Sequence, residues 1–305
     1  MFKNMIRTAT AGLILTVGLA LTGCLENGGT ARGQEGEASG SPASLERPIS
    51  FEPLDQAILE AFLGPEPSEL EGYISFNFSP GALARQLAQP EAGEVYAVIH
   101  TSMGPIFTRL FPQYAPLAVR NFATHANEGF FDGLIFHRVI PNFMIQGGCT
   151  LGTGTGGESI WGQAFNNELT SNLAHIRGAL SMANTGFPFS NRSQFFVVQN
   201  PRSEVANDFL QYFEQVQDVL LVDYFGPEEV RDEDMELTLN HMFPREFLHH
   251  YANYGGTRHL DFLHTVFGHV FYGMDVVDAI AAVDAISDRP IRDVYIITVE
   301  LRVWE

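Results

Sequence analysis

The feature that most constrains this 305-residue chain is the run Phe-His-Arg-Val-Ile-Pro-Asn-Phe-Met-Ile-Gln-Gly-Gly at positions 136–148. It places a cation (Arg138), an amide (Gln146) and two large apolar side chains on one short stretch of backbone. Two shorter runs follow downstream, Ser-Met-Ala-Asn at 181–184 and Ser-Gln-Phe-Phe at 193–196. Three motifs in a fixed order are more specific than any single short pattern.

Short strand patterns surround these runs and predict a mainly β fold. Apolar stretches at 95–100 and 106–111 flank a segment with Gly and Pro, which suits a hairpin turn. Two helices are predicted, one after Pro116 and one after Gly273, by apolar residues at helical spacing. Further short strands are predicted at 134–139, 143–147, 179–183, 194–199, 265–271 and 294–301. Many short strands with two helices predict a closed β-barrel whose ends the helices cap.

The N-terminus has the pattern of a secretory signal. Lys3 and Arg7 precede an apolar stretch at 9–21, which is shorter than the roughly 20 apolar residues that cross a bilayer. Leu-Thr-Gly then leads directly to Cys24, an order similar to the lipobox of bacterial lipoproteins, in which the cysteine is diacylated and begins the mature chain. We therefore interpret residues 1–23 as a signal peptide. The alternative is an ordinary cleaved signal in which Cys24 is incidental.

A lipidated Cys24 would determine where the protein resides. The expected location is the extracytoplasmic side of the bacterial cell membrane, with the lipid chains contributing about 0.8 kcal/mol per buried CH₂ group. The other cysteine, Cys149, then has no partner within the chain, so no disulfide is expected. We expect Cys149 to be a small, half-buried side chain.

The net charge of the chain excludes nucleic acid as a partner. The chain has 17 basic and 36 acidic residues and a net charge of −19, so its surface repels nucleic acid.

Residues 24–47 are rich in Gly, Ser, Ala and Glu, which predicts a flexible tether. Residues 48–93 form an N-terminal extension, in which Pro53 and Gly64 bracket a predicted short helix.

The three runs together resemble the cyclophilin family of peptidyl-prolyl cis-trans isomerases. The resemblance extends from about Glu94 to Asn200 and resumes from about His259 to the C-terminus. It implies that residues 94–305 are a cyclophilin-like barrel, that the substrates are proline-containing polypeptides, and that no cofactor or metal takes part.

The resemblance assigns roles to individual residues. Arg138 corresponds to the catalytic arginine, and Gln146 to the glutamine that holds its guanidinium and contacts a substrate carbonyl. Phe143 corresponds to a residue that acts with them at the proline ring. The other substrate-binding positions implied are Met144, Ala183, Asn184, Gln194, Phe196, Leu260 and His264. Without the resemblance, an isolated arginine would be read as a surface ion pair and the apolar positions as core.

Two neighbours of these residues carry further expectations. His137 should point away from Arg138 along its strand and give structural support. His259 stands where the family often has a tryptophan that donates to cyclosporin, so affinity for that drug should be weak. His264 is expected to be a pocket wall, because the reaction moves no proton.

A long stretch at 202–258 interrupts the resemblance where the family usually has a short loop. Phe209, Phe213, Val216 and Leu220 recur at helical spacing, and a second helix is predicted from Pro244. Between the two helices, acidic residues gather at 228–236. A segment of this length inside a compact domain is usually functional or separately structured. We expect an inserted, acidic α-helical lobe that lies beside the groove and influences the choice of substrate rather than the chemistry.

Two functions follow from these expectations. The first is an exported, membrane-tethered isomerase that assists the folding of secreted proteins. The second is a binding module in which the cyclophilin scaffold recruits a protein partner through the 202–258 insertion, with turnover incidental or lost. Intact Arg138, Phe143, Gln146 and Phe196 favour the first, since a pure scaffold has no need of the arginine.

Overall fold

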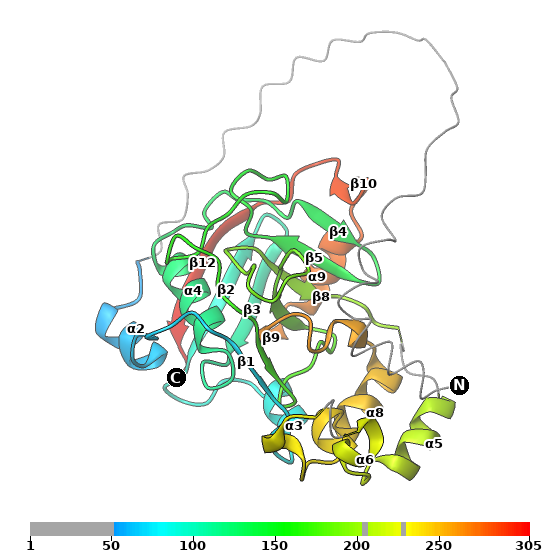
Figure 1. Ribbon diagram of the computed structural model, residues 1–305. Coiled ribbons are helices and arrows are strands. Elements are labelled where there is room, and N and C mark those ends of the chain that lie inside the picture. Colours follow the sequence, from blue (N-terminus) through cyan, green and yellow to red (C-terminus); the bar gives the residue numbers. More distant parts are fainter. Residues whose placement is uncertain (1–51, 203–206, 227–229) are drawn as a thin grey trace, which may run out of the picture. The chain divides into compact units, whose positions relative to one another are not determined.

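The structure is a computed structural model that describes residues 52–202, 207–226 and 230–305 (Figure 1). The predicted signal peptide, Cys24, the tether and the acidic residues Glu228 and Glu229 lie outside these residues. No helix among the described residues combines the length and apolarity needed to cross a bilayer.

An eight-stranded antiparallel sheet forms the frame of the described residues. In spatial order the strands are β12 (Ile296–Val303), β2 (Val95–Thr101), β3 (Gly104–Leu110), β9 (Val266–Tyr272), β7 (Ala179–Met182), β8 (Phe195–Val198), β5 (Met144–Gly147) and β4 (Arg138–Ile140). Register shifts in three of the pairings, between β12 and β2, β3 and β9, and β7 and β9, mark bulges or irregularities. Bulges bend strands and increase their twist, so the sheet curls.

The two edges of the curled sheet are linked through the segment that precedes β4. Ile296 donates to the Leu134 carbonyl at 2.7 Å, and Gly133 donates to the Ile296 carbonyl at 2.9 Å. The strand predicted at 134–139 is therefore divided: its first residues bond to the start of β12, and its last residues belong to β4. The expected mainly β, barrel-like fold with flanking helices is confirmed.

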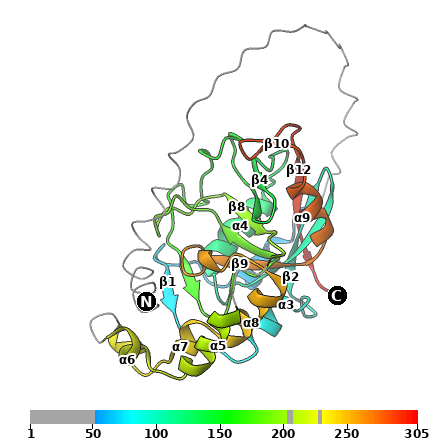
Figure 2. The same ribbon diagram turned by 90° about the vertical axis from the view of Figure 1, so that its right-hand side faces the viewer.

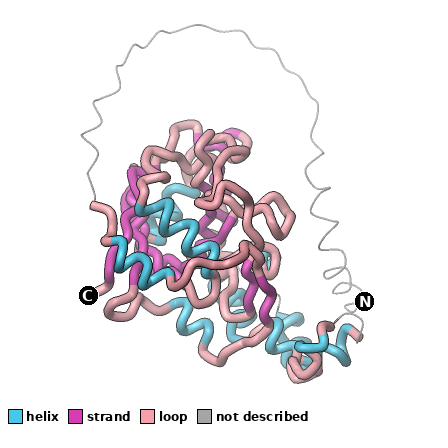
Figure 3. Tube along the Cα trace, turned by 60° about the vertical axis from the view of Figure 1, so that its left-hand side comes forward, coloured by secondary structure: helices cyan, strands magenta, loops and turns pink. Residues whose placement is uncertain are grey.

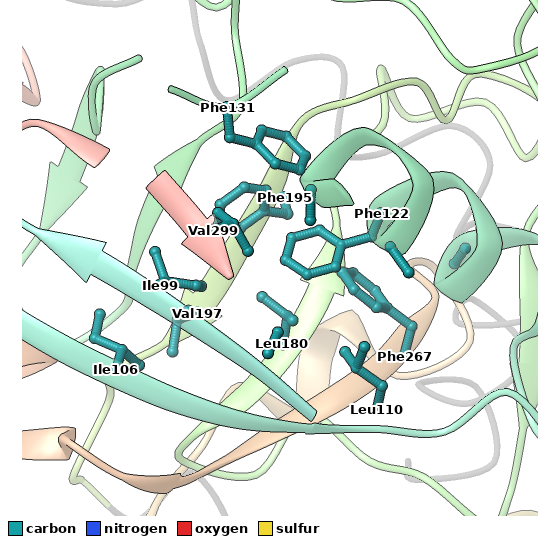
Figure 4. Close-up of a cluster of buried hydrophobic side chains, with 14 of the residues drawn as sticks. Ile99, Ile106, Leu110, Phe122, Phe131, Leu180, Phe195, Val197, Phe267 and Val299 are labelled. Carbon is teal, nitrogen blue, oxygen red and sulfur yellow. The ribbon is translucent and has the colours of Figure 1, made fainter. Parts of the chain in front are cut away.

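Aromatic side chains fill the core between the sheet and the helix α4 (Pro116–Asn127). Figure 4 shows Phe122 of α4 beside Phe195 and Phe267, whose ring centroids lie 5.3 Å from it in both cases. The helix start is held from another strand: Glu168 of β6 (Glu168–Thr170) accepts the N–H groups of Leu117 and Ala118, each at 2.9 Å. These are two of the donors that a helix leaves unpaired at its N-terminus. The helix α9 (Met274–Ala281) packs against β3, β4 and β5 with Val277 and Ile280 in the same core.

The N-terminal extension packs on the barrel through a helix and a strand. The helix α2 (Gln56–Leu63) lies where the sequence predicts one, with Asp55 as its side-chain N-cap. Its Leu59 and Leu63 belong to the barrel core. The strand β1 (Tyr73–Ser75) pairs in parallel with β6, and α3 (Ala82–Leu87) follows it.

The segment at 202–258 is helical where it is described. It contains α5 (Asn207–Val216), α6 (Leu221–Phe225), η1 (Asp232–Asp234), α7 (Leu239–Met242) and α8 (Arg245–Tyr254), and η2 (Arg258–Leu260) follows. Figure 2 shows these helices gathered at one end of the barrel, near α3, and Figure 3 shows helices gathered at the lower end of the described residues. Phe213, Leu221, Leu239 and Leu248 form a small core of their own. The remaining apolar side chains of α8, Phe247 and Tyr251, pack with Ala174 and Ile176 of the barrel side.

The structure also sets the length of the first helix in this segment. The stripe from Phe209 to Leu220 predicts a helix that continues to Leu220, but α5 ends at Val216. The chain then turns, and Leu220 forms an isolated bridge with Thr238. This bridge and the bond from Leu221 to the Leu237 carbonyl, at 2.7 Å, bring the two halves of the lobe together.

Candidate active site

A cavity of about 460 Å³ opens beside β4 and β5, and it gathers the residues singled out by the sequence. Its lining is His137, Arg138, Phe143, Met144, Gln146, Gly152, Thr153, Gly154, Thr155, Ala183, Asn184, Phe196, Leu260, His264, Ser287 and Arg289. Every predicted catalytic or substrate-binding residue is in this set except Gln194, whose side chain bonds to Gln146 and Gly154 of the set. The cavity mixes apolar walls with a few polar groups, which is typical of a ligand site.

The side chain of Arg138 lies at the edge of this cavity, opposite Gln146 in the β4–β5 register. It is 43 % exposed, and its Nε lies 3.3 Å from an oxygen of Asp288. The sequence predicts that Gln146 holds this guanidinium. In the structure, however, Gln146 donates to Gln194 at 2.9 Å, and Asp288 bonds to Arg138. A carboxylate attracts a cation more strongly than a neutral amide does, which accounts for the difference.

Asp288 is a site residue that the sequence analysis missed. It lies in the two-residue turn between β10 (Ala285–Ile286) and β11 (Arg289–Pro290), and Ser287 and Asp288 have φ values of 50° and 66°. Positive φ at both turn positions is the geometry of a type I′ hairpin, which usually carries Asn-Gly or Asp-Gly. Ser-Asp is a weak signal for such a turn, so the sequence pattern does not predict this hairpin.

A glycine-rich loop forms the polar side of the cavity. Gln194 donates to the carbonyls of Gly154 and Gly156, at 2.8 and 2.7 Å. Cys149 binds the same loop, because its Sγ accepts the N–H groups of Gly154 and Gly156 at 3.2 and 3.3 Å. These bonds leave Cys149 buried at 1 % exposure, rather than half-buried as expected. Burial raises the pKa of the thiol, but the N–H groups of the loop outweigh this and lower it overall.

The apolar floor of the cavity is a separate cluster from the barrel core. Met144, Phe196 and Val266 are buried in it, and Phe143 and Leu260 pack against it partly exposed. The His259 ring stacks on Phe143, with centroids 5.7 Å apart and planes at 22°. A ring-sized apolar ligand therefore meets aromatic faces here.

His264 is a wall of the cavity. Its Nδ1 lies 3.0 Å from the Met182 carbonyl, and its ring meets Phe196 edge-on at 5.5 Å. Burial lowers the pKa of His264 to about 4, with smaller contributions from neighbouring imidazoles. The side chain is neutral near pH 7.

The sequence predicts that His137 points away from Arg138, and the structure places it among the residues that line the cavity. It is 6 % exposed, and neither of its ring nitrogens has a hydrogen-bond partner among the described residues. Burial, helped by the charges of Arg289 and Arg138, lowers the pKa of His137 to about 4.

A buried polar network lies behind the floor. It consists of Tyr251, Asp261, His175 and Ser181, joined by hydrogen bonds of 2.9–3.0 Å. No sequence motif predicts this network, since its members are scattered along the chain. No group of three or more His, Cys, Asp or Glu suited to holding a metal occurs within residues 52–202, 207–226 and 230–305.

The barrel and this cavity define a β-barrel protein with a mixed apolar and polar peptide-sized groove. Residues 96–224 and 244–301 match the family described as cyclophilin type peptidyl-prolyl cis-trans isomerase/CLD. The chain belongs to that family, as the three sequence runs predict. It is an enzyme of the peptidyl-prolyl cis-trans isomerase class, and its substrates are proline-containing polypeptides.

Two relatives of similar sequence agree with this assignment. A Staphylococcus aureus protein, named as a candidate peptidyl-prolyl cis-trans isomerase, is 40 % identical over 212 residues, which cover 69 % of this chain and 93 % of that protein. A Streptococcus pyogenes protein, named as a candidate bifunctional phosphatase/peptidyl-prolyl cis-trans isomerase, is 41 % identical over 206 residues, 67 % of this chain and 38 % of that protein. A crystal structure of a Cryptosporidium parvum cyclophilin type isomerase has a TM-score of 0.49 at 24 % identity, and covers 69 % of this chain and 98 % of that one.

Proposed function

We propose that Arg138 catalyses isomerisation without a covalent step, by donating a hydrogen bond to the prolyl nitrogen of a twisted X-Pro amide. Resonance holds this amide planar and sets a barrier of about 18–20 kcal/mol. In the twisted state the nitrogen becomes pyramidal and regains a lone pair, which the planar ground state lacks. A fixed donor aimed at this lone pair stabilises the transition state selectively.

The surroundings of Arg138 support this role. Its guanidinium carries a permanent charge and several donors in a rigid plane. It is half-exposed at the cavity edge, so a peptide can reach it without unfolding the groove. The bond to Asp288 engages Nε, and this leaves the terminal nitrogens available for a substrate.

The other cavity residues would hold the peptide in place. Phe143, Met144, Phe196 and Leu260 offer the proline ring an apolar floor. Gln146 would bond a substrate carbonyl, and the main chain near Asn184 would pair with the peptide in the manner of an added strand. The imidazoles of His137 and His264 are neutral, so the cations among the residues that line the cavity are Arg138 and Arg289. None of these roles transfers a proton.

One observation carries the proposal: Arg138 lines the same cavity as the apolar floor, in which Phe143 and Met144 are its near neighbours in sequence and Phe196 and Leu260 come from distant parts of the chain. The test is cis-trans exchange of a short proline peptide measured by NMR exchange spectroscopy, with the purified protein and with Arg138→Ala. Catalysis that the substitution abolishes supports the mechanism. Catalysis that persists in the variant rejects it.

We also propose that the protein acts outside the cytoplasm, anchored to the bacterial membrane through lipid on Cys24, where it assists the folding of exported proteins. The support is the signal pattern that ends in Leu-Thr-Gly before Cys24. Cys24→Ala should release the protein from membranes or block its maturation, as measured by cell fractionation. Unchanged membrane association after mild extraction would point to a different attachment.

A second candidate role is a binding module that recruits a protein partner through the helical lobe. The observation in its favour is that the lobe has an apolar core of its own and a surplus of acidic residues. Cells that carry only the Arg138→Ala form distinguish the two roles. A scaffold keeps its function in such cells, whereas an isomerase loses it.

A further inference from the structure

One contact between the lobe and the wall of the cavity is made by a phenolic hydroxyl. Tyr251 of α8 is 1 % exposed, and its hydroxyl lies 2.9 Å from both carboxylate oxygens of Asp261. Asp261 follows Leu260, whose side chain lines the cavity. A residue of the helical segment at 202–258 therefore holds the neighbour of a substrate-contacting side chain.

Asp261 is joined to the cavity floor through His175. Its Oδ1 accepts the backbone N–H of His175 and lies 2.9 Å from the Nδ1 of the same residue. The imidazole then stacks on Phe196, with ring centroids 6.0 Å apart and planes at 12°. Phe196 is part of the floor, so a shift of Asp261 moves both Leu260 and the support under Phe196.

The chain that leaves the lobe is locked against the same histidine. A Cβ at Gly256 would lie 2.6 Å from the His175 carbonyl oxygen and 2.6 Å from the Tyr251 ring. Gly256 has a φ of 128°, and the next residue, Thr257, donates to that His175 carbonyl at 2.8 Å. Glycine alone fits this close passage. The end of the lobe, His175 and the floor of the cavity are thus packed as one unit.

The order Ser181, His175, Asp261 is also that of a nucleophile, a base and a carboxylate. Ser181 is 0 % exposed, however, and its hydroxyl donates to the Thr265 carbonyl at 2.8 Å. A substrate cannot reach a hydroxyl buried in this way. The three residues therefore act as supports and not as a hydrolytic site.

We propose that Tyr251 is a positioning residue, through which the helical lobe sets the affinity of the cavity for prolyl substrates. Its hydroxyl fixes Asp261, and Asp261 fixes the Leu260 wall and the His175–Phe196 floor. This inference rests on the isomerase activity proposed for the Arg138 cavity. Tyr251 touches no substrate, so its removal changes binding and leaves the rate of the bound step nearly unchanged.

The test compares Tyr251→Phe with the matched control Tyr254→Phe, which removes the hydroxyl of an exposed tyrosine on the same helix. The dissociation constant of a short proline peptide is measured by titration, kcat by NMR exchange spectroscopy, and folding by thermal unfolding. Losing part of a hydrogen bond to a carboxylate corresponds to about a threefold to tenfold change in an equilibrium constant. Y251F should weaken peptide binding by that factor with kcat unchanged, and Y254F should match the wild type.

The proposed role of Asp261 in linking Tyr251 to the cavity is tested by combining Tyr251→Phe with Asp261→Asn. Residues of one network are non-additive, so Y251F should have a smaller effect on binding in the D261N protein than in the wild type. An equal effect in both backgrounds would overturn the proposed path. If Y251F does not fold, D261N carries the test by itself: weaker binding supports the inference, and unchanged binding rejects it.

Arg138→Ala, measured in parallel, distinguishes a failure of the proposed mechanism from a failure of the inference about Tyr251. If this variant keeps wild-type catalysis, the proposed mechanism fails. If it loses catalysis while folded Y251F binds peptide as tightly as Y254F does, the mechanism stands and the inference about Tyr251 is overturned.

Discussion

The most direct prediction is that Arg138→Ala removes catalysis and leaves the fold intact. A preorganised donor that acts in the transition state contributes about 2.7–4 kcal/mol, so kcat/KM should fall by roughly 10²–10³. The effect on stability should be small, because Arg138 and Asp288 are 43 % and 46 % exposed. An ion pair of such exposure contributes about 0.2–1 kcal/mol. For a domain of this size class, 1 kcal/mol shifts Tm by only about 2–4 °C.

The matched control is Arg302→Ala. The Arg302 side chain is also 43 % exposed and also forms an ion pair, with Glu300 on the same strand, but it does not line the cavity. Both variants lose one positive charge from an acidic protein. Exchange of a short proline peptide, measured alongside thermal unfolding, should therefore show a large loss of activity in the first variant and almost none in the second.

Two results would refute the reasoning. Near-wild-type turnover in a folded Arg138→Ala protein would remove this side chain from the mechanism. Equal losses in the Arg138 and Arg302 variants would mean that the acidic protein needs positive charge in general and not a donor at this place.

Four further predictions follow from the geometry. Activity should be flat above about pH 6, where His137 and His264 with pKa values of about 4 are neutral. The unfolded chain binds protons at these imidazoles at a higher pH than the folded chain does. The two histidines should therefore lower the free energy of unfolding as the pH falls from about 6.5 to 4, and a measurement of Tm against pH tests this. Asp288→Asn should lower kcat/KM by less than tenfold, since it frees a guanidinium that keeps its charge; a loss as large as that of Arg138→Ala would make Asp288 essential. Phe122→Ala should cost about 3–5 kcal/mol in chemical denaturation, because Phe122 is 1 % exposed among aromatic rings; a cost under 1 kcal/mol would contradict this packing.

Most of the predicted cavity residues could be found from the sequence because they belong to short motifs. Arg138, Gln146, Asn184 and Phe196 lie within runs whose neighbours carry the same information, so a resemblance transfers them one by one. Short strands and two helices were likewise readable from periodicity, since each is set by local patterns. The boundaries were less accurate: the strand predicted at 134–139 is divided between two partners, and this depends on pairing across the sheet.

Other features depend on contacts between segments that no local pattern links. Asp288 reaches Arg138 from a hairpin 150 residues later, and Ser-Asp gives little sign of the turn that carries it. His137 lines the cavity together with Arg138, although the strand predicted at 134–139 places the two on opposite faces. The helical lobe was predicted from apolar residues at helical spacing, but this spacing does not show which side chains of the lobe touch the barrel.

The sequence by itself determined the family, the chemistry of the groove and the presence of an extra helical segment, because these reside in residue types and spacings. The tertiary structure decided what the arginine pairs with and how the lobe is attached. The bond from Tyr251 to Asp261 spans ten positions, and Asp261 in turn meets His175, 86 positions away. Such contacts arise when the chain closes on itself and buried polar groups must find partners, and this requirement acts in space rather than along the sequence.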